Sequence, residues 1–176
     1  CYAENSEHIV GLKVRASHVI TGSWGVTPVK LGKKIAKILK LPMMVHVGEP
    51  PALYDEVLEI LGPGDVVTHC FNGKPGGSIV DTPALMEMAQ SLARAGVLMD
   101  IGHGAASFSF RVARRAIAEG LKPYSISTDL HLRNVHGPVS DLATPVSKVL
   151  GSGLGFDDCV RAISTRSRPA SSASVA

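Results

Sequence analysis

Short apolar runs alternate with amphipathic stretches through most of this chain. The apolar runs are rich in Val, Ile and Met, lack strict alternation with polar residues, and end at Gly or at polar turns. This pattern is typical of strands that are buried on both faces. It predicts five strands, at Val10–Val14, Pro42–Val47, Asp65–His69, Val97–Ile101 and Ser125–Asp129.

The amphipathic stretches between these runs predict helices. Thr27 followed by Pro28 has the form of a helix N-cap with proline at the first helical position. Further helices are predicted at Ala52–Leu61, Pro83–Ala95, Phe108–Glu119 and Leu142–Leu150.

The fivefold repeat of strand and helix predicts parallel βαβ units, because successive strands are too far apart in sequence for hairpins. Five units fit either an open doubly wound sheet or an incomplete (β/α)₈ barrel, since a whole barrel takes about 250 residues. The pattern alone leaves both open. Residues 1–165 are predicted to form one domain, and the low-complexity end "SRPASSASVA" predicts a flexible tail at 166–176.

Composition narrows the class of protein. Hydrophobic residues make up 45% and charged residues 19% of the 176 residues, which is typical of a globular domain. The net charge of +3 is spread along the chain and argues against nucleic acid as the main partner. Three scattered cysteines suit the reducing cytoplasm, and the lack of a long apolar run argues against a membrane span. The chain opens with Cys1 instead of Met, as expected of a fragment or a processed product.

Ionisable residues recur toward the carboxyl ends of separate predicted strands. They are Lys13 in "VGLKVRAS", His46 in "MMVHVGEP", His69 in "VVTHCFNG" and Asp129 in "SISTDLH". In a β/α barrel those ends converge on one face. A single histidine on a strand is more often a hydrogen-bonded core residue. Two neutral imidazoles with a carboxylate, however, suit a divalent ion such as Zn²⁺.

Lys13 is the unusual member of this set. A protonated ammonium group cannot ligate a metal, but a lysine buried beside cations loses its proton. The free amine can then capture carbon dioxide as a carbamate, an anion whose two oxygens can bridge two metals. We therefore expect a carbamate on Lys13.

Five phrases together resemble the amidohydrolase superfamily of metal-dependent hydrolases, which includes the dihydroorotases, and in particular its deacetylase-like branch. The phrases are "GLKVRAS", "MMVHVGEPP", "VTHCFNGKPGG", "DIGHGAASFSF" and "ISTDLHLRNVHGP". The resemblance covers roughly residues 8–165. It implies the C-terminal part of a (β/α)₈ TIM barrel, with about five βα units that match the family's strands four to eight.

The resemblance also implies a site. As a carboxylysine, Lys13 would bridge two Zn²⁺ ions, His46 and His69 would bind the more exposed ion, and Asp129 would bind the buried ion and act as general base. The implied reaction is hydrolysis of an amide, cyclic amide or acyl ester by hydroxide that the metals make available. The family's first strand carries a His-x-His pair, which this chain lacks. The simplest interpretation is therefore a truncated chain.

Four residues in the predicted loops are candidates for binding substrate. Asn72 and Lys74 could hold a substrate carboxylate or could lie in a solvated loop. His103 could contact substrate or be a hydrogen-bonded residue of a glycine-rich turn. His131 follows Asp129 and could orient either the substrate or that carboxylate.

Two other functions compete with a hydrolase of small-molecule amides or esters. The first is a catalytically inactive barrel fragment, which lacks the His-x-His half of the metal site. The second is an open α/β module that binds carboxylates. Five parallel strands would also leave two open edges, which predict association of the chain with a second copy.

Overall fold

The computed structural model of the chain describes residues 2–164, and the predicted tail at 166–176 lies outside that range. Within it, four parallel strands form one sheet in the order β1-β2-β3-β4. Their bounds are β1 (Leu12–Ala16), β2 (Met43–Val47), β3 (Val66–Thr68) and β4 (Leu98–Asp100).

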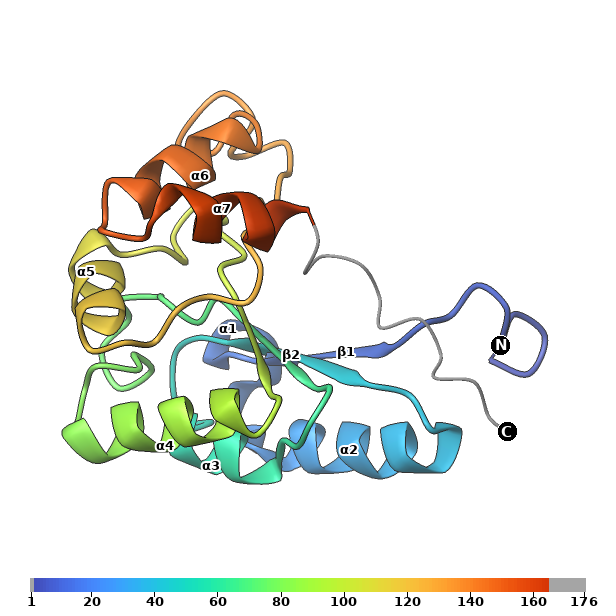
Figure 1. Cartoon of the computed structure of the whole chain (residues 1–176). Helices are drawn as coiled ribbons and strands as arrows, with labels where there is room; N and C mark the ends of the chain where they lie inside the picture. Colours follow the sequence, from blue (N-terminus) through green and yellow to red (C-terminus); the bar gives the residue numbers. More distant parts are fainter. Residues whose placement is uncertain (1, 165–176) are drawn as a thin grey trace.

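The order of the strands decides between the two predicted architectures. Strands that are neighbours in the sheet are also neighbours in the sequence. The connecting helices α2 (Thr27–Leu39), α3 (Tyr54–Ile60) and α4 (Pro83–Arg94) pack beside one another along one side of the strands (Figure 1). A doubly wound sheet instead reverses its strand order and carries helices on both faces. The architecture is therefore a partial (β/α)₈ barrel, as predicted.

The remaining elements lie between β1 and α2 or after β4. The short α1 (His18–Thr21) and a 3₁₀ turn, η1 (Gly22–Trp24), follow β1 and were not predicted. Towards the other end lie α5 (Phe110–Ala118), α6 (Ala143–Leu150) and α7 (Phe156–Ile163). Helix α2 begins at Thr27 with Val26 as its N-cap, so the predicted cap is one residue off.

The fifth predicted strand, Ser125–Asp129, is not a regular strand. A single parallel bridge joins Ser125 to Asp100. Backbone hydrogen bonds from residues 101–104 continue the pairing beyond that bridge. The left-handed backbone of Asp129, with φ of 49°, then ends the extended conformation.

The two faces of the sheet differ in burial, in contrast to the prediction that both are buried. On β2, Met43, Val45 and Val47 are buried against the helices, whereas Met44 and His46 on the opposite face are half-buried. Side chains alternate along a strand, so Met44 and His46 mark what would be the inside of a closed barrel. We call this side of the sheet the lumen face. It stays open because four strands curve without closing.

A buried carboxylate holds the beginnings of two strands together. Asp65 accepts hydrogen bonds from the backbone nitrogens of Met43 and Gly62, each at 2.9 Å, and pairs with the Lys33 ammonium of α2. Asp65 thereby fixes β2, β3 and α2 at the end of the sheet away from the candidate site.

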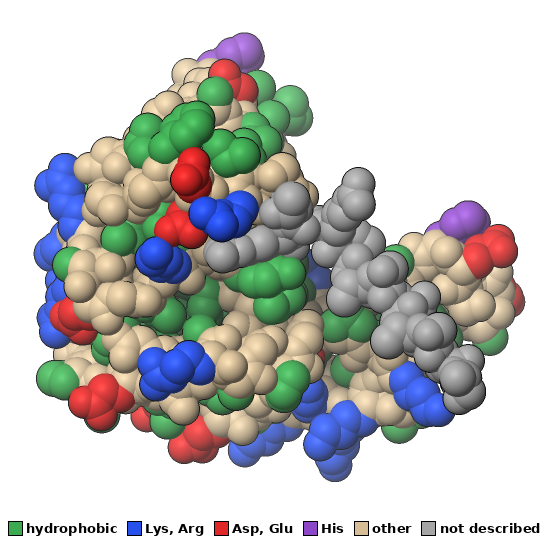
Figure 2. All heavy atoms as spheres, viewed as in Figure 1, with side chains coloured by type: hydrophobic (Ala, Val, Ile, Leu, Met, Phe, Trp, Pro, Cys, Tyr) green, Lys and Arg blue, Asp and Glu red, His purple; other side chains and the backbone are tan. Residues whose placement is uncertain are grey.

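The surface carries charges of both signs. On the face in Figure 2, Lys and Arg side chains are interspersed with Asp and Glu side chains, with apolar patches between them. Among the described residues, no helix is both long enough and apolar enough to cross a membrane.

Candidate active site

The lumen face carries a row of polar side chains near the carboxyl ends of the strands. The strand register sets His46 on β2 beside Arg15 on β1 and beside Thr68 on β3. Thr68 is in turn beside Asp100 on β4, whose carboxylate accepts the Thr68 hydroxyl at 2.7 Å. The predicted site residues are thus set among polar neighbours contributed by all four strands.

Two of the predicted ligands, His46 and His69, are in direct contact. The Nδ1 atom of His46 lies 2.9 Å from the Nε2 atom of His69, and the two rings meet edge to face at 78°. The other nitrogen of His69, Nδ1, faces the Gly102 carbonyl oxygen. A carbonyl only accepts hydrogen bonds, so Nδ1 of His69 carries the proton and Nε2 presents a lone pair. The two histidines converge, as predicted.

Burial keeps both imidazoles neutral. Burial, together with the nearby charges of Arg15 and Lys13 and the repulsion that a protonated His69 would exert, lowers the pKa of His46 to about 3. Burial also lowers the pKa of His69, although the Gly102 hydrogen bond and the Asp129 charge oppose the shift. Neutral imidazole is the form that binds metal ions.

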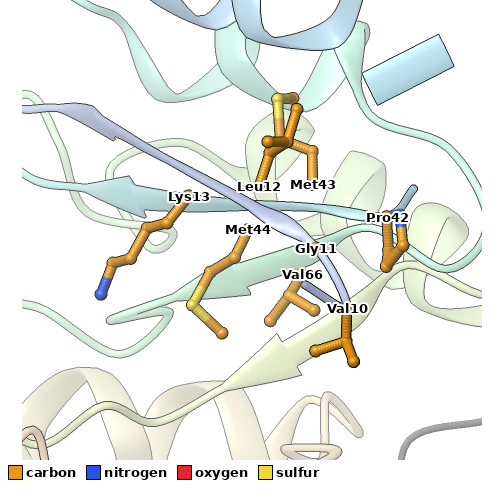
Figure 3. A pocket seen from close by; sticks show the side chains of 8 residues that line it. All are labelled: Val10, Gly11, Leu12, Lys13, Pro42, Met43, Met44 and Val66. Carbon is orange, nitrogen blue, oxygen red and sulfur yellow. The ribbon is translucent and has the colours of Figure 1, made fainter. Parts of the chain in front are cut away.

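Lys13 lies on the lumen face but is exposed. Figure 3 shows its side chain on the same side as Met44 and opposite to Leu12 and Met43. Its charge contributes to the lowered pKa of both histidines, so Lys13 lies within electrostatic range of them. The burial that a neutral amine needs is not provided by the described part of the chain.

The pocket drawn in Figure 3 is not the candidate site. It has a volume of about 300 Å³ and lies at the amino ends of β1 to β3. Its lining is apolar apart from Lys13 and includes neither His46 nor His69.

Asp129 lies at the rim of the lumen face and is exposed. Its carboxylate packs against the backbone of Gly104, where an added Cβ would lie 3.1 Å from Oδ2. Because the Asp129 charge raises the pKa of His69, the carboxylate lies within electrostatic range of the histidine pair.

The residues present fit half of a metal site. Two nitrogen ligands at 2.0–2.1 Å from a tetrahedral ion lie about 3.3 Å apart, so the 2.9 Å between His46 and His69 would have to lengthen by a few tenths of an ångström to hold one. Catalytic zinc sites take three protein ligands and structural sites four. Among residues 2–164, no group of three or more His, Cys, Asp or Glu side chains is close enough together to hold an ion.

Relatives of the chain carry names from one superfamily. A deacetylase of Agrobacterium fabrum is 72% identical over 163 residues, which cover 93% of this chain and 40% of that protein. A deacetylase of Enterococcus faecalis is 42% identical over 164 residues, or 91% of this chain and 44% of that protein. No protein-family model matches the chain.

Solved structures agree with these relatives. A crystal structure of a dihydroorotase matches with a TM-score of 0.91 and 70% identity, over 94% of this chain and 43% of that one. A crystal structure of an adenine deaminase matches with a TM-score of 0.86 and 40% identity, over 94% of this chain and 46% of that one. The resemblance to the amidohydrolase superfamily is confirmed. The chain spans about two fifths of the length of the curated relatives that it matches.

Asn72 is not placed to bind substrate. It is 0% exposed, and its Nδ2 atom donates to the carbonyls of His69 at 3.1 Å and Gly77 at 3.0 Å. Its Oδ1 atom accepts from the backbone nitrogen of Lys74 at 3.1 Å. Every polar atom of the side chain is engaged, so the solvated-loop alternative does not describe Asn72 either.

Lys74 is paired within the chain. Its ammonium lies 2.6 Å from the Glu49 carboxylate, and both side chains are partly exposed. Partial burial acts to raise the pKa of Glu49, but the hydrogen bond and charge of Lys74 bring it below its ordinary value. A substrate carboxylate at Lys74 would therefore have to compete with Glu49.

His103 and His131 differ in access to the rim. His103 is 4% exposed, with Nδ1 2.8 Å from the Gly104 carbonyl and Nε2 3.1 Å from the Lys148 ammonium. This is the hydrogen-bonded turn that was one of the two predicted alternatives. His131 is exposed beyond Asp129, and its Nδ1 atom accepts a hydrogen bond from the backbone nitrogen of Arg133 at 3.2 Å.

Besides the strand residues Arg15, Thr68 and Asp100, three further residues of the site were not predicted. They are Gly102, whose carbonyl orients His69, Glu49, which neutralises Lys74, and Asn134, which is buried behind Asp129. The glycine-rich phrase "DIGHG" was a signal for the first. The acidic residue in "VGEPP" was a signal for Glu49. Nothing in the sequence singled out Asn134, which reads as an ordinary asparagine in a polar loop.

Proposed function

We propose that this chain forms part of a metal-dependent hydrolase that acts on an amide, a cyclic amide or an acyl ester. The observation that carries the proposal is the 2.9 Å contact between ring nitrogens of two neutral histidines from successive barrel units. Relatives and solved structures named deacetylase, dihydroorotase and adenine deaminase support a hydrolase of the amidohydrolase type.

His46 and His69 would hold one divalent ion, with Zn²⁺ suited to their nitrogen ligands. Lys13 as a carbamate and Asp129 would contribute further ligands for a second ion. The remaining ligands would come from the portion of the relatives that this chain does not cover. Bound metal would supply Lewis acidity and would lower the pKa of water to about 7.

Asp129 would act as the general base. Its exposed carboxylate at the rim can accept a proton from the attacking water and return it to the leaving nitrogen or oxygen. His131, also exposed and two residues further along the chain, would orient the substrate beside it. The Gly102 carbonyl would keep His69 in the tautomer that presents Nε2 to the ion.

A chimera tests this proposal. The 163-residue matched segment of the Agrobacterium fabrum deacetylase would be replaced by the corresponding part of this chain. We expect the chimera to hydrolyse acylated substrates of the parent deacetylase at a comparable rate when loaded with Zn²⁺. A folded chimera that retains metal and shows no turnover would contradict the proposal.

A second candidate is a catalytically inactive barrel fragment. Two observations favour it: Lys13 is exposed, and no third metal ligand closes around His46 and His69 among the described residues. Metal content of the chimera, which restores the ligands from the rest of the deacetylase, separates the two. A hydrolase-competent site would retain close to two equivalents of Zn²⁺ after gel filtration, and an inactive fragment one or none.

A further inference from the structure

Two of the predicted site residues share an uncommon backbone conformation. Among residues 2–164, only four residues other than glycine have a positive φ: Lys40, His69, Asp129 and Ser140. His69 has φ of 68° and Asp129 has φ of 49°. This left-handed region is unfavourable for residues with a Cβ atom, so surrounding contacts must hold it.

The left-handed conformation of His69 decides where its side chain points. Thr68 faces the lumen, where its hydroxyl bonds to Asp100. Side chains alternate along a strand, so a regular continuation would send the next residue, His69, towards the helices. His69 instead contacts His46 on the lumen face. The positive φ is therefore what lets two successive residues face the same side.

A buried asparagine hydrogen-bonds to the carbonyl of His69. Asn72 is 0% exposed, and both its backbone nitrogen and its Nδ2 atom donate to the His69 carbonyl, at 3.0 Å and 3.1 Å. The Nδ2 atom of Asn72 also donates to the Gly77 carbonyl, and this bond fixes the asparagine within its own loop.

A second buried asparagine hydrogen-bonds to the carbonyl of Asp129 through its side chain alone. Asn134 is 0% exposed, and its Nδ2 atom donates to the Asp129 carbonyl at 3.0 Å. Its Oδ1 atom accepts from the backbone nitrogen of His131 at 2.8 Å. On the other side, the backbone nitrogen of Gly104 donates to the Thr128 carbonyl at 2.9 Å. Asp129 is thus held between two fixed segments.

We propose that Asn72 and Asn134 are paired positioning residues, each of which locks one site residue in the left-handed conformation by donating its side-chain amide to that residue's carbonyl. Asn72 acts on His69 and thereby on metal binding, and Asn134 acts on Asp129 and thereby on proton transfer. The roles assigned to His69 and Asp129 rest on the proposed function. The two backbone locks can be tested without it.

The first measurement uses the unmodified 176-residue chain, labelled with ¹⁵N and ¹³C. We expect scalar couplings across the hydrogen bonds from Asn72 Nδ2 to the His69 carbonyl carbon and from Asn134 Nδ2 to the Asp129 carbonyl carbon. Slow exchange of both side-chain amides with solvent should accompany them. Fast exchange of both amides, as for exposed asparagines, would overturn the proposal without any variant having to fold.

The second measurement compares Asn72→Asp with Asn134→Asp, which keep the accepting oxygen and lose the amide donor. One-bond Cα–Hα couplings and Cα shifts report the sign of φ. In Asn72→Asp we expect the left-handed signature to disappear at His69 and to persist at Asp129, and in Asn134→Asp the reverse. Asn5→Asp, which adds the same charge near the amino end, should change neither. Persistence of both signatures in both variants would refute the proposal.

The two variants should also differ in function, since Asn72 acts on a proposed metal ligand and Asn134 on the proposed general base. Asn72→Asp should weaken Zn²⁺ binding to the chain about 10–100-fold, the usual effect of changing a residue that orients a ligand. Asn134→Asp, placed in the deacetylase chimera, should lower kcat and leave KM near the parent value. If the parent chain binds no Zn²⁺ and the chimera is inactive, the proposed function fails, and the NMR signatures still decide the positioning claim. Equal loss of stability with both signatures intact would indicate a structural role only.

Discussion

His46 Nδ1 and His69 Nε2 face each other across 2.9 Å, although His46 lies on β2 and His69 directly follows β3, 23 positions further along the chain. The contact requires His69 to be turned by its left-handed backbone and oriented by the Gly102 carbonyl. The contact brings one ring nitrogen from each of two neutral imidazoles to the same place on the lumen face. This pair is the part of the candidate site that the described residues complete on their own.

Stability of the metal-free chain should fall as the pH drops from 7 towards 3. The folded pKa of His46 is about 3 and that of His69 is also lowered, whereas an unfolded histidine titrates near 6.5. Within this window the unfolded chain binds protons that the folded chain does not, so acid favours unfolding and stability rises with pH. Urea unfolding in the presence of a chelator, repeated at several pH values, measures the slope.

Two histidine variants test whether His46 is a cause of this pH dependence. His46→Asn should flatten the dependence of unfolding free energy on pH below about 6.5, the unfolded value. His136→Asn, in an exposed loop, should leave it as in the parent chain. An unchanged slope in His46→Asn would show that the buried histidine does not set the acid sensitivity.

Asp65→Ala should destabilise the chain by about 3–5 kcal/mol, because it leaves the Lys33 ammonium and the backbone N–H groups of Met43 and Gly62 without their acceptor. Chemical unfolding measures the change. Glu119→Ala, which removes an exposed ion pair with Arg115 one helical turn away, is the matched control and should cost less than about 1 kcal/mol. Similar losses in both variants would contradict the role assigned to Asp65.

Gly77→Ala should cost about 1–3 kcal/mol through overpacking. A Cβ atom at this position would lie 1.9 Å from the Gly48 carbonyl oxygen, so the loops that follow β2 and β3 would have to separate. Gly155→Ala is the control, since an added Cβ there meets no atom within 4 Å. Thermal unfolding of both variants tests the expectation, and a neutral Gly77→Ala would mean that the two loops do not depend on this contact.

Asp129→Asn in the deacetylase chimera should lower turnover about 10²–10⁴-fold, the usual contribution of a general base. The amide retains the shape of the side chain but cannot accept the proton. Metal content, measured on the same preparation, should remain substantial. Undiminished turnover would remove Asp129 from the catalytic role.

The sequence predicted the parts of the fold that depend on local pattern. Alternating apolar and amphipathic runs located the four strands and their helices, and polar residues at strand ends indicated His46 and His69. The segment 125–129 was predicted as a strand but forms only an isolated bridge and a few backbone hydrogen bonds to residues 101–104, and the side chains of Ser125 and Ser127 bond to Asp100. Local periodicity carries no information about such a partner.

The finer geometry of the site depends on contacts between distant residues. Asn72 looks like a loop residue in the phrase "HCFNG", yet it is fully buried because its amide turns inward to His69 and Gly77. Lys13 lies on the strand that was predicted for it, but its exposure depends on which segments cover the lumen face. Neither outcome could be derived from spacing along the chain.

The most direct test of the account is a Co²⁺ titration of the 176-residue chain, followed by visible absorption. We expect the parent chain to bind the ion through nitrogen ligands, and both His46→Ala and His69→Ala to weaken binding at least tenfold, with His136→Ala indistinguishable from the parent. Binding of equal strength in all four proteins, or no binding by the parent chain, would contradict the claim that these two histidines form a metal-binding pair.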